Sequence, residues 1–163
     1  MSINAIEENI NMPEVLYEKE MLDWYDNLYC KDEKTKSQVK FLAELFQKNK
    51  AKNILDVSCG TGRHAIELSK IGFDVTGIDK ETTMIRFAKN KAQKCGAKAE
   101  FIVQDMQEIN LEEKFDAAIM MYGSLAYLSS NESVIKCLRS IRNNLKTDIL
   151  SHLLLLALKS HFV

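Results

Sequence analysis

Residues 54–63 decide how this chain folds, and they read Ile54-Leu55-Asp56-Val57-Ser58-Cys59-Gly60-Thr61-Gly62-Arg63. An apolar run enters a turn with two glycines, a helical pattern follows, and a second apolar run ends on the carboxylate of Asp79. Glycine lets a backbone approach a ligand closely, and a carboxylate at the end of the next strand can accept hydrogen bonds from both ribose hydroxyls. The stretch therefore predicts a site for a cofactor that contains a nucleoside.

The composition indicates one ordinary globular domain. The chain has 163 residues, of which 46% are hydrophobic, and its formal net charge is -1. Lysine and arginine are interspersed with the acids, so a domain-wide basic surface for nucleic acid is not expected. The longest apolar run, Leu153–Leu158, is too short to cross a bilayer, and the polar N-terminus is no secretory signal. We therefore expect a cytoplasmic protein with no membrane partner.

The cysteines and histidines predict neither disulfides nor a metal site. The four cysteines are far apart and form no CxxC pair, which favours reduced thiols, and the three histidines have no ligand spacing. His64 stands in the first turn after the glycines, where we interpret it as a surface or packing histidine. Cys59, within the loop, is expected to be half-exposed. No catalytic residue is assigned.

The alternation of apolar runs with helical patterns predicts the fold class. The expected strands are 53–57, 73–79, 99–103 and 115–121, and the expected helices between and after them are 63–71, 81–94 and about 131–145. Such alternation indicates an α/β protein, a Rossmann-like doubly wound parallel sheet with helices on both faces, here truncated after about strand four. Ser129 and Glu132 have the spacing of a capping box for the last helix.

The chain divides into three expected parts. Residues 1–36 form an N-terminal helical segment with a helix over 14–29 and a polar break over 31–37. Residues 37–146 form the core, which begins with a helix over 38–48 whose apolar stripe is Phe41, Leu42, Leu45 and Phe46. Residues 147–163 form an apolar tail without a clear period. Strand four would have an exposed flank unless the tail, a second copy or a partner chain covers it.

Four candidate groups follow the ends of four different strands. Parallel strands bring their carboxyl ends to one edge, so the glycine loop, Asp79, Asp105 and Met121-Tyr122 should gather there. Asp105 could accept a hydrogen bond from an adenine amino group while Met106 packs on the ring. Asp56, buried at the exit of the first strand, should hold the glycine loop in shape.

The residues leave two cofactors open. Gly60-Thr61-Gly62-Arg63-His64-Ala65 satisfies the GxGxxG/A pattern of dinucleotide sites, and Asp79 follows Gly60 by 19 residues. A nicotinamide enzyme is therefore considered. An acid ahead of the loop, and further candidate ligand groups at the third strand, argue against it.

The motifs resemble a known family. Leu55 to Gly62 looks like motif I of the class I S-adenosylmethionine-dependent methyltransferases, and Val75 to Asp79 with Met84 resembles the second motif. Gln104-Asp105-Met106 is similar to the adenine-contacting segment, and Phe115 to Ser124 to motif IV. Tyr25 to Tyr29 resembles the N-terminal helix of small-molecule members.

The resemblance implies S-adenosyl-L-methionine as cofactor and a small-molecule methyl acceptor. The residues that it implies for cofactor binding are Tyr25, Asp56, Gly60, Gly62, Asp79, Lys80, Met84, Asp105, Met106 and Met121. The family continues after the last helix with a fifth strand and an antiparallel pair, and this sequence departs from that pattern at Thr147-Asp148. Two functions follow from this departure: a methyltransferase, or a non-catalytic remnant that binds the cofactor and depends on a partner chain.

Overall fold

A four-stranded parallel sheet forms the centre of the molecule. The structure, a computed structural model, describes residues 21, 22, 24, 26 and 33–146. The strands are β1 (Asn53–Val57), β2 (Asp74–Asp79), β3 (Glu100–Val103) and β4 (Ala117–Met120), and their order is β3-β2-β1-β4. The order reverses between β1 and β4, which is where α/β sheets of this kind bind ligands. The predicted α/β, Rossmann-like fold is confirmed.

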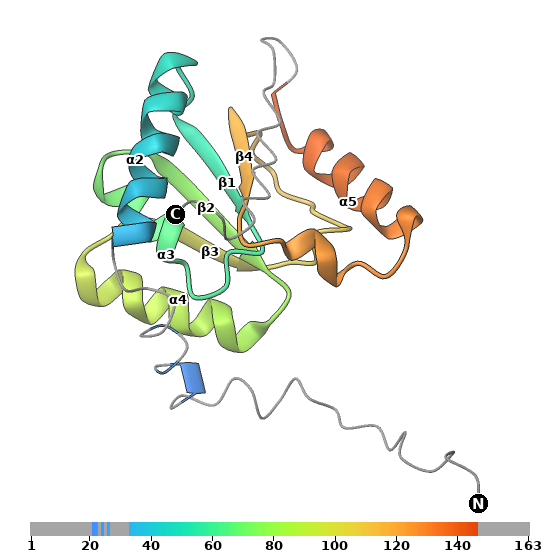
Figure 1. Ribbon diagram of the computed structural model, residues 1–163, viewed down its shortest axis with the longest axis horizontal. Helices are drawn as coiled ribbons and strands as arrows, with labels where there is room; N and C mark the ends of the chain where they lie inside the picture. Colours follow the sequence, from blue (N-terminus) through green and yellow to red (C-terminus); the bar gives the residue numbers. More distant parts are fainter. Residues whose placement is uncertain (1–20, 23, 25, 27–32, 147–163) are drawn as a thin grey trace, which may run out of the picture.

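Helices cover both faces of the sheet (Figure 1). α2 (Glu33–Lys48), α3 (Arg63–Lys70) and α4 (Thr82–Cys95) pack on one face, and α5 (Asn131–Asn143) packs on the other. A short 3-10 helix, η2 (Ser124–Tyr127), joins β4 to α5. Within this part of the chain, no helix is long and apolar enough to cross a membrane.

β1 contributes to two apolar cores because both of its faces are covered. Ile54 packs with α2, α3 and α4, whereas Leu55 and Val57 pack with α5, and all three side chains are fully buried. All four residues of β4 are buried as well. Continuous apolar strands of this kind are typical of parallel sheets covered on both sides.

The first helix of the core differs from its prediction. α2 begins at Glu33, inside the expected polar break, and its buried residues are Thr35, Val39, Leu42, Ala43 and Phe46. Phe41, predicted to face the core, is half exposed. The helix is rotated relative to the predicted stripe because Val39, Leu42 and Phe46 face the core that α2 shares with α3.

The cap and the buried face of α5 also differ from their predictions. The N-cap is Ser130, whose hydroxyl accepts a hydrogen bond from the Ser133 amide at 3.1 Å, rather than Ser129. The apolar row that predicts this helix is Val134, Leu138, Ile141 and Leu145. Ile141 and Leu145 are buried, whereas Val134 and Leu138 are only half-buried, and Cys137 and Ser140 are buried instead. Ser140 faces inward because its hydroxyl accepts the Ile109 amide at 2.7 Å.

The chain after α5 returns to the flank of strand four. The Phe115 amide donates to the Asn144 carbonyl, the Lys146 amide donates to the Phe115 carbonyl, both at 2.9 Å, and Phe115 and Leu145 form a parallel bridge. Among the described residues, β4 itself pairs only with β1. The apolar tail 147–163 lies outside the described residues, and the three-part division of the chain stays a prediction.

Asn144 joins α5 to the segment between β3 and β4, and its loss should destabilise the fold. Its buried side chain donates to the Ile109 and Ser140 carbonyls at 2.9 Å and accepts the Leu111 amide at 3.3 Å. We expect Asn144→Ala to lower the free energy of unfolding by about 3 kcal/mol, because these backbone groups lose their partner. Urea denaturation measures this. A loss below about 1 kcal/mol, as expected for the exposed control Asn143→Ala, would contradict it.

Candidate functional site

The loop after β1 is held in an unusual backbone conformation. Ser58, Gly60 and Gly62 have φ values of 56°, 55° and 73°, in the left-handed region that favours glycine. The Cys59 amide donates to the Ile78 carbonyl at 2.9 Å, and the Gly62 amide donates to the Cys59 carbonyl at 3.0 Å. These two hydrogen bonds fix the loop against the end of β2, at the edge of the sheet.

The two loop glycines are required for different reasons. A Cβ on Gly62 would lie 2.6 Å from the Phe101 ring and 3.0 Å from the Ala88 Cβ, so Gly62 serves internal packing. A Cβ on Gly60 would meet nothing within 4 Å. Gly60 therefore leaves space beside the loop, as a backbone approached by a ligand requires. Ligand binding by either glycine stays a prediction.

Asp79 links the glycine loop to the start of α4. Its Oδ2 accepts the Gly60 amide at 2.9 Å, and its Oδ1 accepts the Glu81 amide at 3.0 Å. The carboxylate therefore fixes the chain at the start of the next helix and also holds the loop. A carboxylate has about four lone-pair sites, so acceptor capacity is left for ribose hydroxyls.

Asp56 is a fully buried carboxyl group beneath the loop. Its Oδ2 has no hydrogen-bond partner among the described residues. Burial raises its pKa to about 7, the Arg63 guanidinium and the Ala65 amide oppose this rise, and Asp79 adds to it. A buried acceptor without a partner marks a place for a donor that the described residues do not supply. This orphaned oxygen and the space beside Gly60 fit a cofactor that carries an ammonium group and a ribose.

The segment after β3 meets the glycine loop through a sulfur atom. The Ser58 hydroxyl lies 3.5 Å from the Met106 Sδ and donates to it. Asp105 is exposed, and its Oδ1 accepts the Gln107 amide at 2.7 Å. The structure thus brings Met106 to the loop, whereas Asp105 lies beside it at the surface.

The end of β4 joins the site through Tyr122. This residue has a φ of 59°, and its phenol donates to the Gln38 Oε1 at 3.0 Å. The Arg63 guanidinium lies 3.8 Å from the centre of its ring, a cation–π contact. Met121, just before it, is buried in the core shared with α2, α3 and α4. A left-handed conformation at a bulky residue is strained, and strain of this kind clusters at functional sites.

His64 and Cys59 are both buried. His64 Nε2 lies 3.0 Å from Gln38 Oε1, and burial lowers its pKa to about 3, with Arg63 and Lys91 adding to the effect. His64 is therefore a neutral packing histidine, one of the two roles expected for it. The expectation that Cys59 is half-exposed is wrong, because the loop turns its thiol against Gly77. Burial raises the pKa of Cys59, so the thiol is unreactive.

The remaining predicted site residues lie in three settings. Lys80 is exposed and 3.8 Å from Glu81, Met84 is buried on α4, and Tyr25 lies outside the described residues. None of these placements tests a role in binding. The described cysteines form no disulfide, and the described residues contain no cluster of metal ligands.

Sequence reasoning missed the side chains that connect the site over long distances. Gln38 joins His64 and Tyr122, and Asp26 contacts Thr61, which stands between the two glycines. Gln38 lies 84 residues before Tyr122 and Asp26 lies 35 before Thr61. No local sequence pattern predicts such pairs. The close approach of Phe101 and Cys59 to Gly77 was also missed, but the sequence does carry a signal for it, because a glycine inside a buried strand indicates a close approach.

The fold and the site together define a class of protein. A sheet of order β3-β2-β1-β4, a glycine loop after β1 and an acid after β2 match the class I S-adenosylmethionine-dependent methyltransferases. The family model of the methyltransferase domain matches residues 54–148. The chain therefore belongs to the methyltransferase domain family, whose cofactor is S-adenosyl-L-methionine.

Known proteins of this family cover most of the chain. A Geobacillus sp. (strain WCH70) protein, named as a candidate methyltransferase, is 35% identical over 127 residues, which are 77% of this chain and 51% of that protein. The dTDP-3-amino-3,4,6-trideoxy-alpha-D-glucopyranose N,N-dimethyltransferase of Streptomyces venezuelae is 27% identical over 80% of this chain and 55% of its own length.

Solved structures agree with the fold. The S-adenosylmethionine-dependent methyltransferase of Clostridium acetobutylicum ATCC 824 superposes with a TM-score of 0.68 and 26% identity, over 78% of this chain and 52% of that structure. The chain thus spans about half the length of the curated relatives that it matches.

His64 and Asp56 should have opposite effects on the pH dependence of stability. His64 has a folded pKa below its unfolded value, so its contribution to stability is lost as pH falls below about 6.5. Asp56 has a folded pKa above its unfolded value, so its contribution is lost as pH rises toward about 7. Between about pH 4.5 and 6, the two groups change the free energy of unfolding with pH by equal and opposite amounts, so their effects cancel in the cofactor-free protein.

Replacing either group should reveal how the other group makes the free energy of unfolding depend on pH. Relative to wild type, His64→Gln should gain about 1.4 kcal/mol per unit of pH decrease in this range, and Asp56→Asn should lose a similar amount. Urea denaturation at several pH values measures both. Parallel profiles for wild type and His64→Gln would show that the histidine is not buried in its neutral form.

The two loop glycines should respond differently to alanine. Gly62→Ala should lower the free energy of unfolding by about 3 kcal/mol, because its methyl group overlaps Phe101 in a strained backbone. Gly60→Ala should cost only about 1 kcal/mol, the left-handed conformation alone. Chemical denaturation compares them. Phe101→Leu should recover part of the loss in Gly62→Ala; equal losses for both glycines would contradict the assignment.

Proposed function

We propose that this chain binds S-adenosyl-L-methionine at the carboxyl edge of β1, β2 and β4, and that the protein transfers a methyl group to a small-molecule acceptor. The observation that carries the proposal is the hydrogen bond from the Gly60 amide to Asp79, at 2.9 Å. It places an acid with free acceptor capacity beside a loop with open space. The buried, unpartnered Asp56 oxygen beneath the same loop supports it.

Each part of the edge has a proposed role in holding the cofactor. Asp79 accepts the ribose hydroxyls, and the glycine loop faces the amino-acid part. Asp56 Oδ2 accepts the ammonium group, which supplies the donor that this oxygen lacks. Met106 packs against the adenine, and Asp105 accepts its amino group. These roles extend the resemblance of the motifs and rest on the contacts of Asp79, Asp56 and Met106 described above.

The chemistry needs orientation more than proton transfer. When bound, S-adenosylmethionine supplies an electrophilic methyl group on a sulfonium sulfur. The chain's own contribution is to hold the acceptor in line with that methyl group and to exclude water. Tyr122, fixed by Gln38 and by the Arg63 guanidinium, forms a rigid wall at the end of β4. An acceptor that is already nucleophilic, such as a neutral amine, requires no catalytic base here.

The acceptor class is proposed from the relatives. The Streptomyces venezuelae relative is named for an aminosugar nucleotide, which is a small molecule. Because this chain spans about half of that relative, the activity, the acceptor and any dimer or partner chain on β4 are proposals for the whole protein. A cytoplasmic location stays a prediction.

Two alternatives remain distinct in experiment. A non-catalytic remnant would depend on a partner chain beside β4, because the described residues give that strand one neighbour. A nicotinamide enzyme would use the same sheet order, so topology does not separate it from a methyltransferase. Calorimetric titration with S-adenosylmethionine, S-adenosylhomocysteine and NAD separates the cofactors. Binding of NAD alone would overturn the proposal. Binding of none by the chain alone would favour the remnant, whose cofactor binding depends on a partner chain.

Removing the acid at the end of β2 should abolish cofactor binding. We expect Asp79→Ala to weaken S-adenosylhomocysteine at least about 100-fold, because ribose acceptors and the anchor of Gly60 are both lost. Isothermal titration measures the affinity. Asp74→Ala is the matched control, since this exposed acid lies at the opposite end of the same strand. Unchanged affinity in Asp79→Ala would refute the ribose assignment.

A further inference from the structure

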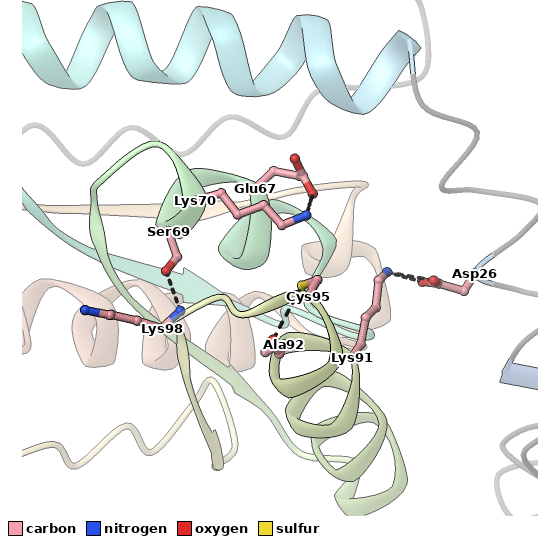
Figure 2. Close-up of polar contacts among 8 residues, drawn as sticks. All are labelled: Asp26, Glu67, Ser69, Lys70, Lys91, Ala92, Cys95 and Lys98. Atoms are coloured by element: carbon pink, nitrogen blue, oxygen red, sulfur yellow. Dashed lines mark hydrogen bonds and ion pairs between the residues drawn. The ribbon is translucent and has the colours of Figure 1, made fainter.

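Asp26 connects three parts of the chain that are far apart in sequence. Its Oδ1 accepts the Thr61 hydroxyl at 2.7 Å, and Lys91 Nζ lies 2.7 Å from Oδ1 and 2.6 Å from Oδ2. Figure 2 shows the contact between Asp26 and Lys91 on α4. The N-terminal residues, the glycine loop and α4 therefore meet at one carboxylate.

This carboxylate lies in a partly desolvated position. The side chains of Asp26 and Lys91 are 18% and 27% exposed, and Thr61 is buried. A charged hydrogen bond in such a setting is screened less by salt and is stronger than an exposed pair. Leu22, four residues before Asp26, is only 2% exposed, so this side chain also packs on the protein.

The contact with Thr61 fixes the loop at its centre. Thr61 stands between Gly60, which borders the open space, and Gly62, which is packed against Phe101. Asp79 holds Gly60 from the β2 side, and Asp26 holds Thr61 from the N-terminal side. The loop is thus held at three successive residues before any ligand arrives.

We propose that Asp26 is a positioning residue for the cofactor, acting through Thr61 and Lys91. Its carboxylate, paired with Lys91 on α4, holds the glycine loop in the binding conformation. The loop then loses its conformational entropy during folding rather than during binding. The affinity for the cofactor is higher as a result. The proposal rests on the proposed function, because it concerns the same cofactor site.

The affinity for S-adenosylhomocysteine tests whether Asp26 positions the cofactor site. Asp26→Asn and Lys91→Gln should each weaken binding about tenfold, and the double variant should be no weaker than either single variant. Lys91→Arg should restore affinity to within about threefold of wild type, because it keeps the charge. Thr61→Val removes only the hydroxyl contact and should weaken binding as well. This variant replaces Asp26→Asn in the test if Asp26→Asn does not fold.

The control is an ion pair of the same length outside the loop. Lys70 and Glu67 on α3 lie 2.6 Å apart and are also drawn in Figure 2. Lys70→Gln should leave the affinity within about twofold of wild type, since this exposed pair contributes little. Thermal unfolding of each cofactor-free variant shows whether a loss of affinity is only a loss of fold.

Trp24 provides a readout that needs no cofactor. It is the only tryptophan of the sequence, its side chain is 58% exposed, and it lies two residues from Asp26. Its fluorescence anisotropy should fall in Asp26→Asn and stay unchanged in Lys70→Gln. Unchanged affinity in Asp26→Asn, with or without a lower melting temperature, would show that the contacts of Asp26 with Thr61 and Lys91 are purely structural, and would overturn the proposal. Failure of the wild-type protein to bind S-adenosylhomocysteine would instead overturn the proposed function and this inference with it.

Discussion

The ring of Phe101 lies between two glycines, and the site depends on that close approach. A Cβ on Gly62 would lie 2.6 Å from the ring, and a Cβ on Gly77 would lie 2.9 Å from it and from the Cys59 sulfur. The glycine loop, β2 and β3 can therefore touch only where side chains are absent. Protein interiors are packed closely enough that a single added methyl group must displace its neighbours. The position of the loop is thus set by packing before any ligand is considered.

That packing explains why charged groups are tolerated below the loop. Once the loop lies on β2, the Gly60 amide reaches Asp79, and Asp56 is buried next to the Ala65 amide of α3. Burial of a lone carboxylate is costly, and here the nearby Arg63 and the Ala65 amide offset only part of the cost, so its pKa stays near 7. Among the residues that the structure describes, Asp56 Oδ2 is thus a buried acceptor without a hydrogen-bond partner. Such a group is expected where a ligand completes the hydrogen bonding.

The parts of the fold that follow local patterns were predictable, and the long-range contacts were not. β1 has its predicted range, 53–57. The helical period of residues 81–94 predicts Met84, Ile85, Ala88 and Ala92 on the inner face, and all four are buried, because apolar periodicity reports burial directly. The start and rotation of α2 and the cap of α5 depend on what each element packs against. At the site, the motif predicted Asp79 and Met106 beside the loop. Asp26 and Gln38 act across the fold, and no spacing in the sequence encodes their partners.

Tyr122 shows how the end of β4 depends on residues that pack beside the glycine loop. Its left-handed backbone is strained, and strain persists only where surrounding contacts enforce it. Those contacts come from Gln38 on α2 and Arg63 on α3, both on the face that also packs the glycine loop. Arg63 also faces Asp56 electrostatically, so one guanidinium acts on the buried acid and on the aromatic wall. The geometry at the end of β4 is therefore set by residues within 33–146, and in the proposed function the acceptor meets a Tyr122 side chain that is already held in place.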